Sequence, residues 1–186
     1  MNKGIFQSAA LTVLALGLTL SAHAAENGKS ILTKPRPVQQ TNEWRPHVAV
    51  LVGAAQPEGS GVAASEFGID VGYQPYIPYG LSAELNHSRI DDGSQTKDRN
   101  TLWAKGTYNF GGDTMIIKDS YAGVGVGSVF KSDGTSLAIA PIVGFDIPMD
   151  VGERNFISLG ASSRYAIVND GEVDTLSLAA VVKYWY

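Results

Sequence analysis

The sequence LSLAAVVKYWY, residues 176–186, ends the chain and decides its fold. Its side chains alternate between two faces. One face carries Leu178, Ala180, Val182, Tyr184 and Tyr186, and the other carries Ser177, Ala179, Val181, Lys183 and Trp185. Alternation over about ten residues is typical of a β-strand that crosses a bilayer. Such a strand also explains the terminal aromatic residues, which favour the interface between lipid and water.

Seven further segments alternate in the same way, so we predict an all-β, eight-stranded, antiparallel up-and-down transmembrane β-barrel. The expected strands are residues 45–54, 66–74, 81–89, 101–110, 120–130, 137–146, 156–167 and 176–186. Roughly nine to eleven residues is the length that a tilted strand needs to cross a bilayer, whereas strands of globular proteins are usually shorter. Pro141 interrupts the sixth segment. Because it cannot donate a ladder hydrogen bond, we expect a bulge or a misplaced strand there.

One face of each expected strand is apolar and without charge, and the other carries the polar side chains. In a barrel the polar face lines the lumen, where buried charges must pair. The residues expected to form these lumen ion pairs are Asp70, Glu84, Lys105, Arg164 and Lys183. Eight strands enclose a lumen just wide enough for side chains to fill. The inward glycines of residues 123–127 leave space there for Trp103 or Arg164.

The aromatic residues are expected to form two girdles at the membrane interfaces. If the first strand runs outward from the periplasm, one rim collects Trp44, Tyr73, Tyr76, Tyr79, Phe110, Tyr121, Phe145, Phe156 and Tyr186. The other rim collects Phe67, Trp103, Phe130 and Tyr165. A soluble sandwich of two sheets is the alternative, and these girdles favour the membrane barrel.

The first 24 residues have the pattern of a secretory signal peptide. Lys3 gives a positive start, residues 9–20 form an apolar core, and cleavage is expected between Ala24 and Ala25 after the small residue Ala22. The apolar core is far shorter than the roughly 20 residues of a transmembrane helix. Residues 25–43 are polar and contain two prolines, so we expect a flexible periplasmic tail before a barrel domain of residues 44–186.

Composition excludes several functional classes. The formal net charge is −4, and no basic stripe exists to neutralise the phosphates of a nucleic acid. The chain has no cysteine, which excludes disulfides, thiolate zinc sites and cysteine nucleophiles. No motif indicates a metal or a cofactor.

Three stretches resemble the small outer-membrane β-barrel family that includes the OmpA transmembrane domain and OmpX-like proteins. These are Tyr121 to Gly127 (YAGVGVG), Gly160 to Tyr165 (GASSRY), and the aromatic terminus. The alternating residues Leu178, Ala180, Val182, Tyr184 and Tyr186 are similar to the C-terminal assembly signal of such proteins. The resemblance implies a monomer in the outer membrane of a Gram-negative-type envelope. Its partners would be outer-membrane lipid and the barrel-assembly machinery.

The expected function is that of an integral outer-membrane protein with a side-chain-filled interior and a structural or surface role. The alternative is a narrow, porin-like channel for a small or hydrophobic solute. A lipid-modifying barrel enzyme is disfavoured because it needs a nucleophile beside a base. His87 and Ser88 are adjacent in one strand, so their side chains face opposite sides. The longest outer loop is expected at residues 90–100, with no protruding sheet for adhesion.

Overall fold

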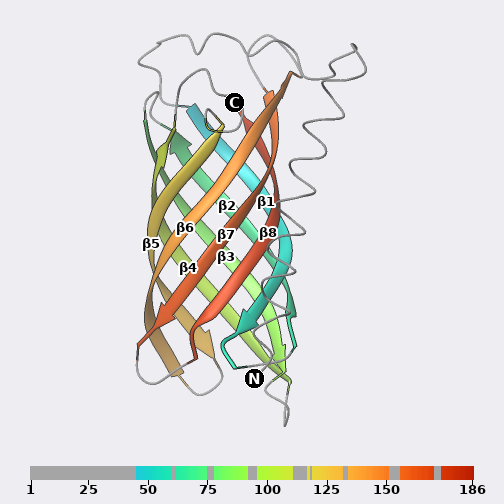
Figure 1. Ribbon diagram of the computed structural model, residues 1–186, viewed down its shortest axis with the longest axis vertical. Helices are drawn as coiled ribbons and strands as arrows, with labels where there is room; N and C mark the ends of the chain where they lie inside the picture. Colours follow the sequence, from blue (N-terminus) through green and yellow to red (C-terminus); the bar gives the residue numbers. More distant parts are fainter. Residues whose placement is uncertain are drawn as a thin grey trace. The chain divides into compact units, whose positions relative to one another are not determined.

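The computed structural model describes residues 45–59, 62–74, 78–91, 96–110, 117, 119–131, 134–150, 156–169 and 173–186. In these ranges the chain forms eight antiparallel strands, and the last pairs with the first to close a barrel (Figure 1). The strands are β1 (Arg45–Pro57), β2 (Ala64–Gln74), β3 (Tyr79–Asp91), β4 (Thr96–Asn109), β5 (Ser120–Lys131), β6 (Gly134–Asp150), β7 (Phe156–Val168) and β8 (Thr175–Trp185). The predicted fold class is confirmed.

The expected signal peptide (residues 1–24), its cleavage site and the expected tail (residues 25–43) lie outside the described residues, as do Trp44 and Tyr76. They therefore stay predictions. Within the described ranges, no helix is both long and apolar enough to cross a membrane.

Several strands are longer than predicted. The charged segment 90–100 was expected as a loop, but its described residues, 90–91 and 96–100, continue β3 and β4, because Arg89 pairs with Asp98 and Asp91 with Thr96. Likewise β6 runs to Asp150 rather than ending at Asp146, and its last residues stay paired with β7. The predicted strands were too short because charged residues were interpreted as loop residues. An antiparallel ladder tolerates polar side chains wherever both faces meet water.

Pro141 causes neither a bulge nor a change of register, so the expectation of a bulge or a misplaced strand is wrong. It lies within β6 opposite Val124 of β5. Toward β7, the pairing stops after Ile139↔Ile167 and resumes at Ile142↔Arg164 with the same register. The missing donor is thus accommodated by a short gap in one ladder, which keeps the two faces of β6 in phase.

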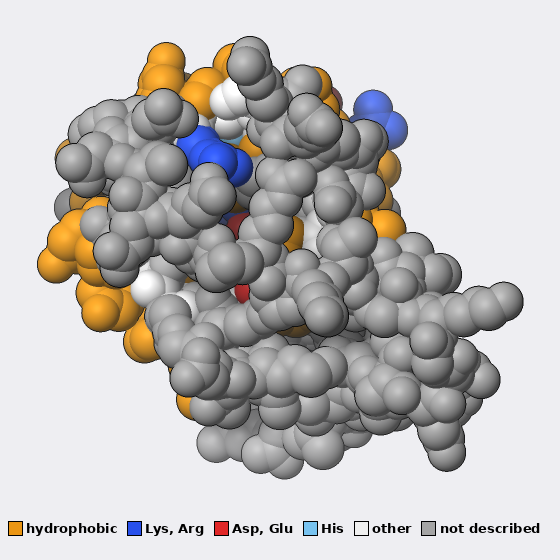
Figure 2. Space-filling model, turned by 90° about the horizontal axis from the view of Figure 1, so that it is seen from above, with side chains coloured by type: hydrophobic (Ala, Val, Ile, Leu, Met, Phe, Trp, Pro, Cys, Tyr) orange, Lys and Arg blue, Asp and Glu red, His pale blue; other side chains and the backbone are white. Residues whose placement is uncertain are grey.

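The two faces of the wall differ in the way that the alternation predicts. On β1, Val48, Val50 and Val52 are 40–53% exposed, whereas Ala49 and Leu51 are at most 5% exposed. Figure 2 looks along the barrel and shows hydrophobic side chains on the visible outer wall and acidic side chains within the hollow. Among the described residues, the expectation of an uncharged outer face is wrong where β3 ends and β4 begins, since Arg89 and Asp98 point outward there and form an exposed ion pair.

The aromatic residues follow the predicted girdles only in part. Tyr79 packs edge-on against Tyr108, and Tyr108 against Phe110, on the outer wall near the end at which β1 begins. Two residues assigned to the girdles instead point into the lumen: Trp103 is 1% exposed, and Tyr121 lies beside Gly144. Both have the parity of the inward-facing residues of their strands. For Trp103 this position agrees with the lumen space expected beside the inward glycines, and for Tyr121 the rim position is wrong.

Candidate functional site

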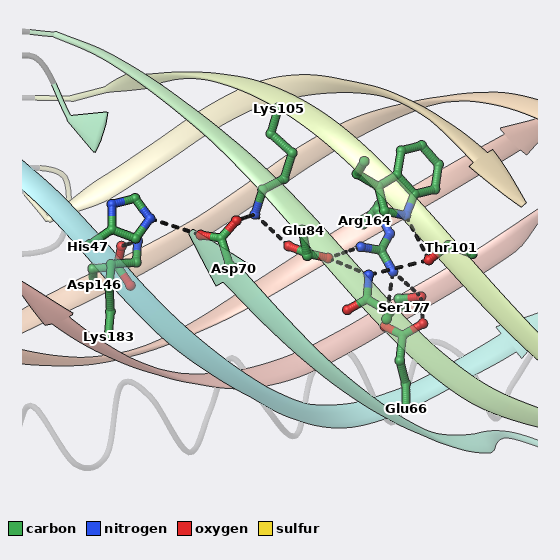
Figure 3. A network of polar contacts seen from close by, with 12 residues as sticks. His47, Glu66, Asp70, Glu84, Thr101, Lys105, Asp146, Arg164, Ser177 and Lys183 are labelled. Carbon is green, nitrogen blue, oxygen red and sulfur yellow. Dashed lines mark hydrogen bonds and ion pairs between the residues drawn. The ribbon is translucent and has the colours of Figure 1, made fainter. Parts of the chain in front are cut away.

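The lumen holds a network of polar side chains that runs along the barrel (Figure 3). We call it the lumen network. Its members are His47, Glu66, Asp70, Glu84, Asn86, Thr101, Lys105, Asp146, Arg164, Ser177 and Lys183. They come from β1, β2, β3, β4, β6, β7 and β8, so the network ties together strands that are far apart in the sequence.

Lys105 bridges two carboxylates at the centre of the network. Its Nζ lies 2.8 Å from Asp70 Oδ1 and 2.5 Å from Glu84 Oε2. The other oxygen of Asp70 lies 2.9 Å from His47 Nε2. All these side chains are at most 10% exposed, so the lysine ammonium compensates carboxylates that have lost most of their water.

Arg164 continues the network toward the other end of the barrel. Its guanidinium donates to Glu84 through Nη1 and to Glu66 Oε1 through Nη2, the latter over 3.0 Å. Ser177 Oγ donates to the second oxygen of Glu66 over 3.2 Å. The guanidinium also lies 5.0 Å from the centre of the Trp103 ring, a cation–π contact. Arg164 therefore holds two acidic side chains and an indole in fixed positions.

Lys183 forms a second ion pair, near the end at which β1 begins. Its Nζ lies 2.5 Å from Asp146 Oδ2, and the ammonium lies over the rings of Tyr121 and Trp185 at 5.6 and 5.2 Å. The indole Nε1 of Trp185 donates to Ser158 Oγ over 3.0 Å. Its ring also lies 4.7 Å from that of His47, so this ion pair adjoins the first group of charges through aromatic contacts.

Inward glycines make room for the large side chains of the lumen. A Cβ atom added at Gly125 would lie 3.2 Å from the Trp103 ring, and one at Gly127 would lie 2.7 Å from it. In the same way, a Cβ at Gly72 would lie 2.8 Å from the His47 ring. The expected space beside β5 is thus occupied by Trp103, and the Arg164 guanidinium lies 5.0 Å from the centre of the indole ring.

Among the described residues that point into the lumen, leaving aside the outermost residues of each strand, the acidic and basic side chains are equal in number. The acids are Glu66, Asp70, Glu84 and Asp146, and the bases are Arg99, Lys105, Arg164 and Lys183. A balanced set leaves no strong field of one sign along the bore. Such a lumen can hold strands together, and its balanced charge does not draw ions of one sign through the bore.

The structure brings four of the five predicted lumen residues into contact: Asp70, Glu84, Lys105 and Arg164. Lys183 instead pairs with Asp146, which the sequence analysis had placed at a strand end. His47, Glu66 and Asp146 were not predicted as partners. Each has the parity of its strand's inward face, so the alternation contained the signal. What it lacked was the stagger between strands that sets which inward residues meet.

His87 points outward and lies 2.9 Å, through Nδ1, from Asn100 Oδ1, while Ser88 is inward and 3% exposed. The two side chains are therefore on opposite sides of the wall, as their adjacency predicts. Among the described residues no group of three or more histidine, cysteine or acidic side chains could hold a metal ion. The alternating C-terminal residues, Leu178 to Tyr186, line the outer wall of β8. Their role as an assembly signal stays a prediction.

No family model matches the chain, and no curated protein sequence matches it. Solved structures do. Neisserial surface protein A is 16% identical, with a TM-score of 0.52, over 75% of this chain and 95% of that one. The attachment invasion locus protein Ail of Yersinia pestis is 11% identical, with a TM-score of 0.44, over 77% and 97%. The outer membrane protein OprG of Pseudomonas aeruginosa is 13% identical, with a TM-score of 0.40, over 77% and 95%. Of these three, the first has a TM-score above 0.5, and the low identity limits the conclusion to the fold. The chain shares the barrel fold of Neisserial surface protein A.

Proposed function

We propose that the protein is an integral outer-membrane β-barrel with a structural or surface role in a Gram-negative-type envelope. The outer wall supports this location. Val50, Ile69 and Val182 lie side by side on β1, β2 and β8 and are 50–56% exposed. A wall of exposed, large apolar side chains is unusual for a protein dissolved in water but suits a surface covered by lipid.

The lumen network supports a further part of the proposal, which is that side chains fill the bore. Lys105 and Arg164 reach across the lumen to acids on β2 and β3, and Trp103 fills the space beside the inward glycines of β5. A barrel of eight strands leaves little room beyond these side chains. The bore then serves as a rigid core rather than as a passage for solutes.

The remaining parts of the proposal come from the sequence. Residues 1–24 would direct export and be removed after Ala24, and the C-terminal residues Leu178 to Tyr186 would be recognised by the barrel-assembly machinery. The mature protein would act as a monomer in outer-membrane lipid and would not be an enzyme. No nucleic acid is expected as a partner, because the acidic chain has no basic stripe.

Two measurements test the proposal. Membrane fractionation with comparison of unheated and heated gel mobility tests the location: we expect the protein in the outer-membrane fraction, with a mobility that changes on heating. Conductance of the purified, folded protein in planar bilayers tests the filled bore: we expect no steps above baseline. Discrete conductance steps would favour the alternative of a narrow channel, and a soluble periplasmic monomer would contradict the whole proposal.

A further inference from the structure

Arg99 is a buried cation at the loop end of the barrel, by which we mean the end where β1 stops and β8 begins. It is the fourth residue of β4, points into the lumen and is only 6% exposed. Its Nη1 donates to the hydroxyl of Thr175, the first residue of β8, over 2.5 Å. Its Nε is buried without a hydrogen-bond partner.

This arrangement differs from that of the other lumen cations. Lys105, Arg164 and Lys183 each lie within 3.0 Å of at least one carboxylate oxygen. Within the described ranges, no carboxylate lies within ion-pair distance of Arg99, and Thr175 is its only hydrogen-bond partner.

The acid that attracts Arg99 electrostatically is Glu66, and its two oxygens are already engaged. Arg164 donates to one and Ser177 to the other. A second cation, Lys131, ends β5 just beyond the pairing of Asn100 with Phe130 and so lies toward the same end of the barrel. Lys131 has a contact of its own, so Arg99 is the cation considered for a further ligand.

The edge of the guanidinium formed by Nε and Nη2 can donate two parallel hydrogen bonds once the side chains that enclose Nε move aside. This geometry matches two oxygens of a phosphate or a carboxylate, and charge-assisted bonds of this kind are the strong ones. Thr175 holds Nη1 and so fixes the orientation of the fork. A desolvated guanidinium without an anion is unfavourable, which gives an incoming oxyanion a reason to bind.

We propose that Arg99 and Thr175 form an oxyanion site at the loop end of the lumen, and that its ligand is a phosphate group. The phosphate has two possible sources, free inorganic phosphate and the headgroup of a lipid. In either case Arg99 supplies the charge and the two donors, and Thr175 is a positioning residue. The site is separate from the proposed structural role, since the barrel closes without it.

The test compares wild type with Arg99→Gln and, as the matched control, Arg89→Gln. Arg89 is also a guanidinium near the loop end, but it points outward and is 73% exposed. Binding of inorganic phosphate is measured by calorimetry at constant ionic strength, with the barrel folded in a maltoside detergent that contains no phosphate. Heat-modifiable mobility first establishes that each variant is folded. We expect Arg99→Gln to fold, because no described carboxylate loses an ion-pair partner within 4.0 Å and glutamine keeps a donor near Thr175; Thr175→Val serves as a second variant.

We expect saturable phosphate binding in wild type, unchanged binding in Arg89→Gln, and binding weaker by roughly ten- to a hundredfold in Arg99→Gln. A parallel arm reconstitutes the proteins with phosphatidylglycerol and measures retained lipid by native mass spectrometry. Lipid lost only in Arg99→Gln would identify a headgroup as the source, while an effect on inorganic phosphate alone would identify the free anion. The proposal is overturned if wild type binds neither, or if Arg89→Gln loses as much as Arg99→Gln.

Discussion

Lys183 Nζ lies 2.5 Å from Asp146 Oδ2 and reaches past the intervening strand β7 to make this contact. Gly160 of β7 makes the path possible, because a Cβ atom there would lie 2.8 Å from Asp146 Oδ1. The two side chains are 11% and 15% exposed, so water screens their attraction only weakly.

We expect a double-mutant cycle on this pair to give a coupling energy of about 1–3 kcal/mol. The cycle uses Lys183→Gln, Asp146→Asn and the double variant, with unfolding in urea followed by heat-modifiable mobility. The exposed pair Arg89–Asp98 is the control, and its coupling should be about 0–1 kcal/mol and fall further with salt. Equal coupling in both pairs would contradict a desolvated lumen.

Lys105→Ala should destabilise the barrel by about 3–5 kcal/mol, because it leaves Asp70 and Glu84 buried without the ammonium between them. The measurement is the temperature or the urea concentration at which the unheated gel band disappears. The double variant Lys105→Met with Asp70→Asn restores charge balance and should recover part of the loss. An unchanged transition in Lys105→Ala would remove the energetic role assigned to the lumen network.

Val50→Lys should destabilise the barrel in lipid by about 2–4 kcal/mol, because Val50 faces outward near the middle of β1, where the bilayer would be most apolar. Leu137→Lys is the control: it is also outward, but near the loop end of β6, and should cost about 0–1 kcal/mol. Stability is measured by urea titration in vesicles. The same small cost at both positions would mean that this wall does not face lipid tails.

Trp103 should escape quenching by lipids brominated in their acyl chains, since it is 1% exposed and faces the lumen. The measurement is tryptophan fluorescence in a variant that keeps only this indole, made by Trp44→Phe and Trp185→Phe. The matched control moves the indole one residue to the outer wall with Leu102→Trp and Trp103→Phe, and should be strongly quenched. Quenching of Trp103 itself would place its indole against lipid and contradict its position beside the inward glycines of β5.

The alternation along the chain was sufficient to predict the strand count, the closed barrel and the face of nearly every residue, because period 2 is a local property. Pro141 did not disturb this, since the gap it causes leaves the register of β6 and β7 unchanged. Strand ends were harder to predict. Asp98 looked like a loop residue, yet it pairs with Arg89 across β3 and β4, and pairing is a property of two strands together.

The ion-pair partners inside the lumen could not be predicted either, because they too depend on how several strands lie together. Lys183 and Asp146 are inward by parity, but their contact depends on the tilt and stagger of three strands, which no single stretch encodes. The girdle error at Tyr121 is different in kind. Its inward parity was available in the sequence, and a general preference of aromatic residues for interfaces was allowed to outweigh it. Trp103 was given both a rim position and the lumen space beside the inward glycines, and the structure agrees with the second.

The contacts of Arg164 join residues that are remote along the chain: Glu66 is 98 residues away, and Glu84 is 80. Neither contact can form while the sheet is still an open ribbon, because β2 and β7 come together only through closure. A half-inserted chain would therefore carry these charges into the bilayer without compensation. The interior thus makes partial assembly unfavourable, and we expect insertion to be cooperative, with strands committing together rather than one by one.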